Sequence, residues 1–162
     1  MADDQDVSST GSPWTISWGE FAEREPALAR FGAGRLTAAP AYLATVRRSG
    51  APRVHPVSPI FTAVGLYLFM EPTSPKRRDL RERGWFAMHN GVPDNAGSGG
   101  EFWVTGRGFA VDDRDLWSHV ADSAGYAPLE RYILVEFQLS EARCNGYGDV
   151  PLPSTQRWSV DP

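Results

Sequence analysis

Short segments of apolar or alternating apolar and polar residues fill the chain from residue 42 onward, and they constrain its fold more than any other feature. Gly, Pro, Asn or Asp separate these segments, which is typical of strands joined by tight turns. The expected strands cover residues 42–46, 53–61, 66–70, 85–89, 101–111 and 131–139. Strands with short connections and few helices predict a mainly β fold, namely a six-stranded antiparallel β-barrel with peripheral helices.

Helix-start signals lie before and between these segments. Ser17 stands three residues before a glutamate, which is the spacing of a capping box, and Pro26 marks the start of a second short helix that Gly32 weakens. Further helices are expected over residues 75–83 and after the Asp112–Asp113 pair, whose carboxylates suit a helix N-cap.

The chain has 162 residues, a length that favours one domain. Residues 1–13 lack apolar periodicity and are expected to form a disordered tail. Residues 14–162 are expected to form a single barrel domain that begins with a helical segment. We find no internal repeat and no linker to a second domain.

Charge and composition exclude several functional classes. The net charge of −4 argues against a dedicated nucleic-acid or membrane-binding protein, and no apolar run is long enough to span a bilayer. The single cysteine, Cys144, excludes a disulfide framework and a cysteine-based zinc site. His55, His89 and His119 lack metal-ligand spacing, so no metal is expected, and His89 is expected to be a strand-end histidine with a backbone partner. The expected location is the cytoplasm.

Residues 76–83 form a basic island with five cations and two acids in an otherwise acidic chain. Ser74 suits an N-cap and Pro75 the first helical position, which places Lys76 and Arg77 in the first turn, where the helix dipole is already positive. Free amides, the Ser74 hydroxyl and the Lys76 ammonium together favour a phosphate site. The alternative is a solvated helix face.

The strand over residues 53–61 contains Pro56 and Pro59, which cannot donate to a β-ladder, so one side of this strand must have unpaired positions. An edge position, a bulge or a bound ligand would explain them. A hairpin with the next strand would place Met70 beside Val57 and would bring Arg53 near residues 73–76. Alternation puts Arg53 on the same face as Val57.

The run YLATVRRSGAPRVHPVSPIF, followed by LYLFMEPTSPKRRDL, resembles the pyridoxamine 5′-phosphate oxidase-like, flavin-binding split-barrel superfamily over roughly residues 36–139. The resemblance implies a split barrel, a homodimer, and FMN in a cleft that both subunits build. Arg53 and Lys76 would lie at the phosphate, and the strand through Ser58 would lie against the flavin ring. The candidate cofactor-binding residues are Arg53, Val54, His55, Pro56, Val57, Ser58, Met70, Thr73, Ser74, Lys76 and Arg77. Trp158 joins them because no strand is expected around this tryptophan to place it in the core.

The chain departs from the pyridoxamine phosphate oxidases themselves at Ser58 and Pro75, where their pattern has a lysine and an arginine. It also lacks their C-terminal arginine-and-histidine motif. We therefore expect a flavin-dependent oxidoreductase of another specificity, similar to the actinobacterial flavin and deazaflavin-dependent branch. Three alternatives stay open: the deazaflavin coenzyme F-420 in place of FMN, a non-catalytic flavin-binding protein, and a small-barrel nucleic-acid binder. No catalytic residue is identified.

Overall fold

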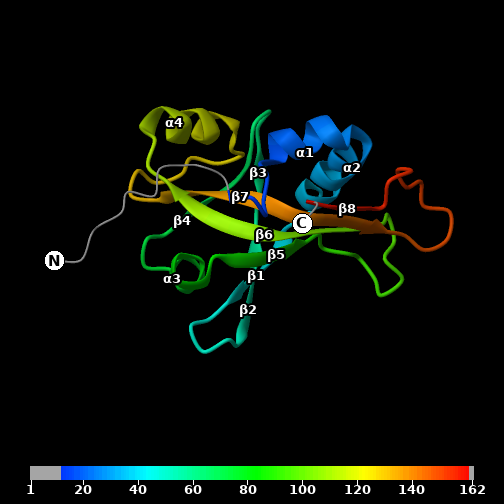
Figure 1. The fold of residues 1–162 in the computed structure, drawn as a ribbon, viewed down its shortest axis with the longest axis horizontal. Coiled ribbons are helices and arrows are strands. Elements are labelled where there is room, and N and C mark those ends of the chain that lie inside the picture. The colour runs from blue at the N-terminus through cyan, green and yellow to red at the C-terminus, as the bar shows by residue number, and fades with distance from the viewer. Residues whose placement is uncertain (1–11, 161–162) are drawn as a thin grey trace.

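Residues 12–160 are described by the computed structural model, and within them eight antiparallel strands form one curled sheet (Figure 1). The strands are β1 (Ala41–Val46), β2 (Pro52–Val57), β3 (Ile60–Phe61), β4 (Leu66–Met70), β5 (Trp85–His89), β6 (Glu101–Val111), β7 (Ile133–Asn145) and β8 (Arg157–Ser159). They lie in the order β2-β1-β5-β6-β7-β4-β3, with β8 paired to β7 outside this path. The expected mainly β architecture with peripheral helices is confirmed, but the count of six strands is wrong.

One interrupted segment of chain closes the sheet. β2 and β3 are consecutive in sequence, separated only by Ser58 and Pro59, yet they are the first and last strands of the sheet order. The chain therefore passes from one end of the sheet to the other within two residues, which draws the two ends together. The expected single strand over residues 53–61 is wrong because Pro59 cannot donate to a ladder and ends β2.

The expected hairpin between this segment and β4 forms in part. Ile60 pairs with Tyr67 and Phe61 with Leu66, and the ladder then stops. β2 pairs with β1 instead, where Val57 lies opposite Ala41. The predicted pairing of the whole 53–61 segment with β4 is therefore wrong, although β2 and β4 still approach each other across the opening between the two ends of the sheet.

β3 results from the split of the expected 53–61 strand, whereas β8 and the second half of β7 were missed for a common reason. β7 continues through Ser140, Glu141 and Arg143 to Asn145, six residues beyond its expected end. It pairs with β4 through its first half and with β8 through its second half. This second half is polar and carries few of the β-branched residues that mark strands in a sequence, so tertiary pairing rather than local propensity makes it a strand.

Four helices lie around the sheet within the described residues: α1 (Trp18–Arg24), α2 (Pro26–Thr37), α3 (Pro75–Arg83) and α4 (Arg114–Ser123). The predicted capping box is confirmed, because the Glu20 amide donates to Ser17 Oγ at 3.2 Å and the Ser17 amide donates to Glu20 Oε2 at 2.9 Å. Asp113 caps α4 as expected, with its carboxylate accepting from the Leu116 amide at 2.9 Å.

The core lies between the curled sheet and the helices α1 and α2. The Trp18 ring packs edge-on against Phe21 and Phe61, with ring centroids 5.2 Å and 4.6 Å apart. Gly32 lies against the Phe102 ring so closely that a Cβ there would come within 2.3 Å of it. This glycine therefore lets α2 approach the sheet and does not weaken the helix end, which extends to Thr37.

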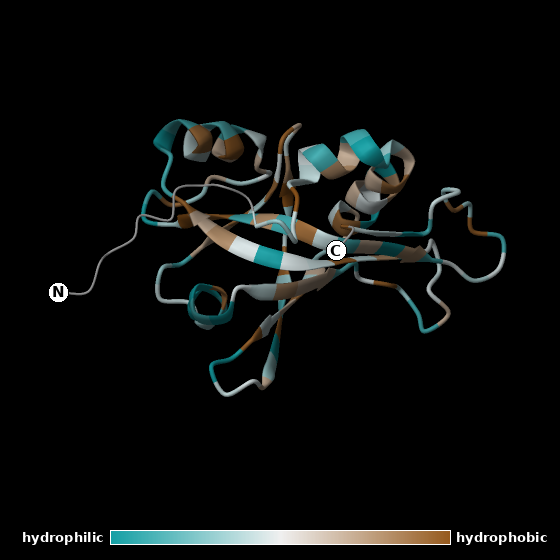
Figure 2. Cartoon of the chain, in the orientation of Figure 1, coloured by the Kyte–Doolittle hydropathy of each residue, from teal (hydrophilic) through white to brown (hydrophobic). Residues whose placement is uncertain are grey.

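α3 differs from the other helices because nearly all of it is hydrophilic (Figure 2). No helix within residues 12–160 combines the length and the apolar character required to cross a membrane. The expected disordered tail over residues 1–13 falls almost wholly on residues 1–11, outside the described residues.

Candidate functional site

The start of α3 presents donors suited to an anion. Ser74 is the N-cap, and its hydroxyl accepts from the Arg77 amide at 3.4 Å, while Pro75 fills the first helical position. The sequence prediction of this cap is confirmed. Lys76 follows in the first turn, where the unpaired amides of the helix already attract negative charge. The helix has nine residues, with no acid in its first turn.

A cavity of about 320 Å³ lies beside this helix start, between the end of β2 and the middle of β4. It forms where the two ends of the curled sheet approach without pairing. Its lining comes from Pro40, Pro56, Val57, Ser58, Leu68, Phe69, Lys76 and Tyr126. Leu68 and Phe69 provide apolar walls, and the Lys76 side chain is the single charged group among the lining residues. The site is therefore a cleft with mostly apolar residues and one cation in its lining.

Lys76 has no hydrogen bond or ion pair to any residue in 12–160 and is partly buried. Burial lowers the pKa of its ammonium group because removal from water disfavours the charged form. A partly buried cation without a partner is costly for the folded protein, and an anionic ligand in the cavity would remove that cost.

Arg53 reaches the same end of the sheet from β2, but it is held by a partner that the sequence analysis had not assigned. Its Nε donates to the Asp79 Oδ2 of α3 at 2.8 Å, and the Thr45 hydroxyl donates to the same oxygen at 2.8 Å. Asp79 is only 4% exposed, so its carboxylate is buried between strand and helix. The pair ties α3 to the sheet and so fixes the position of Lys76.

The signal for Asp79 was present in the sequence. Asp79 stands directly before Leu80, the one apolar residue of the island at residues 76–83, and both are buried. The charge pattern alone left a solvated helix face open as the alternative, because the burial of Asp79 could not be known before the strands were placed.

His55 lies on the inward face of β2 with Arg53 and Val57, while Val54 and Pro56 point outward, which confirms the predicted alternation. Nε2 of His55 is buried and has no hydrogen-bond partner within residues 12–160. Burial lowers the pKa of His55, and the nearby charges of Lys76 and Arg53 lower it further. The charges of two cations therefore act on this imidazole, and an anion bound nearby would offset them.

The remaining predicted residues are distributed more widely. Met70 is 1% exposed and pairs with Ile133, so it belongs to the core. Thr73 is exposed in the turn before α3 and does not line the cavity. Arg77 does not line this cavity; it lines two other cavities, one between α3 and β6 and one toward α4. Trp158 lies in β8 and packs on Phe21, with centroids 4.9 Å apart, so the premise that no strand explains it is wrong.

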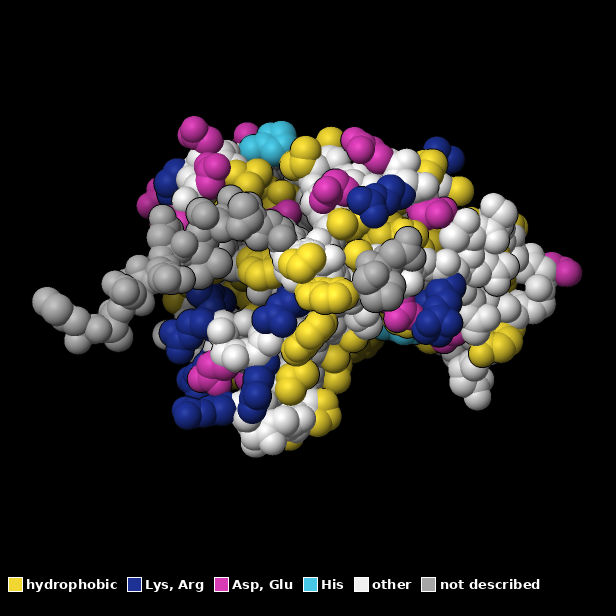
Figure 3. Space-filling model, in the orientation of Figure 1, with side chains coloured by type: hydrophobic (Ala, Val, Ile, Leu, Met, Phe, Trp, Pro, Cys, Tyr) yellow, Lys and Arg dark blue, Asp and Glu magenta, His cyan; other side chains and the backbone are white. Residues whose placement is uncertain are grey.

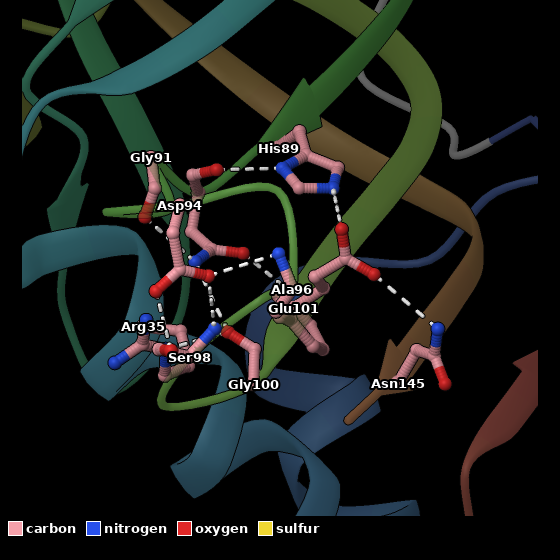
Figure 4. Close-up of polar contacts among 11 residues, drawn as sticks. Arg35, His89, Gly91, Asp94, Ala96, Ser98, Gly100, Glu101 and Asn145 are labelled. Atoms are coloured by element: carbon pink, nitrogen blue, oxygen red, sulfur yellow. Dashed lines mark hydrogen bonds and ion pairs between the residues drawn. The ribbon is translucent and has the colours of Figure 1, made fainter. Parts of the chain in front are cut away.

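A second polar cluster surrounds the end of β5 (Figure 4). Nδ1 of His89 lies 2.6 Å from the carbonyl oxygen of Asn90, and its ring stacks on Trp103 with centroids 5.8 Å apart. Glu101 lies 3.9 Å from His89 Nε2 and accepts a hydrogen bond from Asn145. His89 thus has the backbone partner expected for a strand-end histidine. No group of three or more potential metal ligands occurs in residues 12–160.

Comparison with known proteins supports the fold. No family model matches the chain, and no curated protein sequence matches it. Among solved structures, the chain is similar to a NimC/NimA family protein from Clostridium acetobutylicum, with a TM-score of 0.62, 15% identity, and coverage of 79% of this chain and 94% of that one. It is also similar to HutZ, a heme storage protein from Vibrio cholerae, with a TM-score of 0.54, 18% identity, and coverage of 71% and 89%.

A heme binding protein from Mycobacterium smegmatis is a third structural neighbour, with a TM-score of 0.58 and 16% identity over 78% of this chain and 57% of that one. At such identities the likeness concerns the fold alone. The chain therefore has a split-barrel-like fold with peripheral helices, as its sequence predicted.

Proposed function

We propose that the protein binds FMN in the cavity between β2 and β4 and acts as a small flavin-dependent oxidoreductase. The observation that carries the proposal is Lys76, a partly buried cation without a partner at the start of α3 and at the rim of the cavity. The flavin phosphate would lie between the Lys76 ammonium, the Ser74 hydroxyl and the first amides of the helix.

The residues present fit the cofactor. Lys76 and Arg53, whose charges both act on His55, suit a phosphate, and the apolar side chains of Leu68 and Phe69 in the cavity lining suit a flat aromatic ring. β2 is the terminal strand of the sheet order, so its backbone groups facing away from β1 have no strand partner in the described residues and can bind polar ring atoms. The bound flavin would supply hydride transfer.

The protein's own contribution would be binding, orientation and exclusion of water. Asp79 and Thr45 hold Arg53 in place and anchor α3 on the sheet, so the donors around Lys76 are fixed before a ligand binds. Ser58 is exposed at the cavity and offers a hydroxyl near the end of β2. No described residue is assigned as an acid or base.

We also propose that two copies associate through the outer face of β1, β2 and β5. Exposed apolar side chains meet there: Tyr42 is 49% exposed, Val54 60% and Trp85 47%. Tyr42 pairs across the strands with Pro56, which also lines the cavity. The apolar face is therefore continuous with the candidate site. An exposed apolar face of this kind favours association. A volume of about 320 Å³ is at the lower limit of small-molecule sites, so a second subunit would complete the cleft.

Reconstitution tests the cofactor directly. Purified protein is incubated separately with FMN, coenzyme F-420 and heme, freed of unbound ligand, and examined by visible absorption. We expect one FMN retained per chain. Retention of F-420 alone would favour the deazaflavin alternative. Two structural neighbours are named for heme, so retention of heme alone would favour a heme-binding role and overturn the proposal.

Catalysis requires a separate test. FMN-loaded protein is mixed with NADH or NADPH and an uncharged acceptor such as menadione, and reduced nicotinamide consumption is followed. Turnover above that of free FMN supports an oxidoreductase. Stable flavin binding without turnover by any donor would favour the non-catalytic alternative.

A further inference from the structure

A second cavity, of about 490 Å³, lies between α3 and β6 and shares no lining residue with the cavity at Lys76. Four arginine side chains line it: Arg77, Arg81 and Arg83 from α3, and Arg107 from β6. Glu82 is the single acid among the lining residues. Figure 3 shows Lys and Arg side chains gathered at the end of the molecule where α3 and the β1–β2 turn lie.

The floor of this arginine groove is apolar. Leu80, Phe109 and Val135 line it beneath the guanidinium groups. Arg107 is held in place from below, because its guanidinium lies 4.9 Å from the centre of the Trp85 ring. The groove therefore combines several guanidinium groups, of which Arg107 is held by Trp85, with apolar residues, and a simple solvated helix face has no such apolar lining.

Arg77 is the most informative residue of the groove. Its Nε is buried and has no hydrogen-bond partner within residues 12–160. Burial and the neighbouring Arg81, one helical turn further on, both lower the pKa of Arg77. Of the two acids on the same helix, Asp79 is committed to Arg53 and Thr45, and Glu82 forms no ion pair within residues 12–160. The buried cation thus has an unused donor and like-charged neighbours, and an anion in the groove would satisfy both.

A third cavity, of about 280 Å³, extends the groove toward α4 and shares Arg77 and Ala110 with it. Trp117 and Tyr132 line this extension, together with Asp112, Asp113 and Arg114 at its α4 end. Arg77 therefore lies where an arginine-rich section meets an aromatic section, and a ligand that spans both would place its charge near Arg77.

We propose that the arginine groove is a binding site for a small organic anion, whose oxyanion group contacts Arg77 and Arg81 and whose apolar or aromatic part lies on Leu80 and Phe109. A carboxylate or a phosphate has the chemistry for these guanidinium groups. The concave, apolar-floored shape favours a small amphiphilic anion over a nucleic-acid backbone, which prefers an extended basic surface. This site is separate from the FMN cavity and does not depend on the proposed flavin function.

Phenyl phosphate tests the proposal, with inorganic phosphate and benzyl alcohol as probes of each part alone. Binding to full-length protein at fixed ionic strength is followed by NMR of the arginine Nε–H groups and of the Gly84 and Gly108 amides. We compare the wild type with Arg77→Gln, Arg81→Gln and the matched control Arg78→Gln. Arg78 is exposed on the same helix and lines none of the three cavities described above. Lys76→Ala removes phosphate binding at the other cavity.

We expect phenyl phosphate to shift the resonances of the groove in the wild type and in Lys76→Ala alike. Arg77→Gln or Arg81→Gln should weaken binding about tenfold, and Arg78→Gln less than about twofold. If Arg78→Gln weakens phenyl phosphate binding as much as Arg77→Gln does, the ligand is held by general charge attraction. That result would overturn the proposed site. Shifts confined to the Lys76 cavity, or inorganic phosphate binding as tightly as phenyl phosphate, would also contradict the proposal. If Arg77→Gln fails to fold, the exposed Arg81→Gln variant decides.

Discussion

Replacement of Lys76 by alanine should weaken FMN binding without weakening the fold. In the free protein the ammonium group has no partner within residues 12–160 and is partly buried, so its loss leaves no group unsatisfied. In the complex it would form a charge-assisted hydrogen bond to the flavin phosphate, an interaction that contributes about 1.5–3 kcal/mol. We therefore expect the affinity for FMN to fall roughly 10- to 150-fold.

The assay compares two ligands and three proteins. FMN and riboflavin, which lacks the phosphate, are titrated against the wild type, Lys76→Ala and Arg78→Ala, and the quenching of flavin fluorescence gives each dissociation constant. Arg78 is the matched control because it lies on the same helix but is exposed and outside the cavity. Urea unfolding of the three proteins checks that the fold is unchanged.

Lys76→Ala should weaken the binding of FMN and leave the binding of riboflavin unchanged, so that the dissociation constants of the two ligands become similar. A variant that binds both ligands equally less well would show that Lys76 supports the cavity in general. If Lys76→Ala binds FMN as tightly as the wild type, the flavin phosphate does not lie at the start of α3. The observation that carries the proposed function would then be refuted.

Four further outcomes follow from the same geometry. Asp79→Asn should lower the free energy of unfolding by about 2–3 kcal/mol in urea, somewhat less than a fully buried pair would cost, because Arg53 is 24% exposed. The lowered pKa of His55 means that the unfolded chain binds this proton more tightly, so stability should fall as the pH drops below the unfolded value near 6.5, and His55→Gln should remove that slope. Light scattering should give about twice the chain mass, and Val54→Glu, on the outer apolar face, should give the monomer with the fold retained. FMN-loaded protein should oxidise pyridoxine phosphate negligibly in an oxygen-consumption assay, because the cavity has one cation among its lining residues; turnover near one per second would contradict this.

Local signals predicted the elements around the candidate site well. LYLFM became β4, residues 75–83 became α3 behind the Ser74 cap, and residues 85–89 and 101–111 became β5 and β6 with the expected bounds. Glycines bound these segments: Gly65 precedes β4, Gly84 separates α3 from β5, and Gly100 precedes β6, while Ser74 caps α3. Elements with such chemistry are determined by neighbouring residues, so a single sequence suffices to predict them.

Pairing between distant segments could not be predicted in the same way. The sequence placed residues 53–61 in one hairpin with β4, whereas Pro59 splits the segment and β2 pairs with β1. The buried role of Asp79 depends on the pairing of β2 with β1, and the position of Trp158 depends on the pairing of β8 with β7; both were missed. The rotation of α3 about its axis also decides which cavity each cation of residues 76–83 lines. Because of this rotation, Lys76 and Arg77 line different cavities.

The break at Pro59 also explains why a cavity exists at this place. If residues 53–61 had formed one strand paired with β4 along its length, the two ends of the sheet would have joined and Leu68, on the inner face of β4, would face a closed barrel. Because the ladder stops at Ile60, the ends approach without joining, and side chains of both ends line the opening. α3 begins five residues after β4 and is anchored by Asp79 to Arg53 of β2, so it spans the same opening. A full ladder would have stabilised the sheet further. Its absence leaves a cleft with mostly apolar residues and the cation of Lys76 in its lining, and this is where we propose that FMN binds.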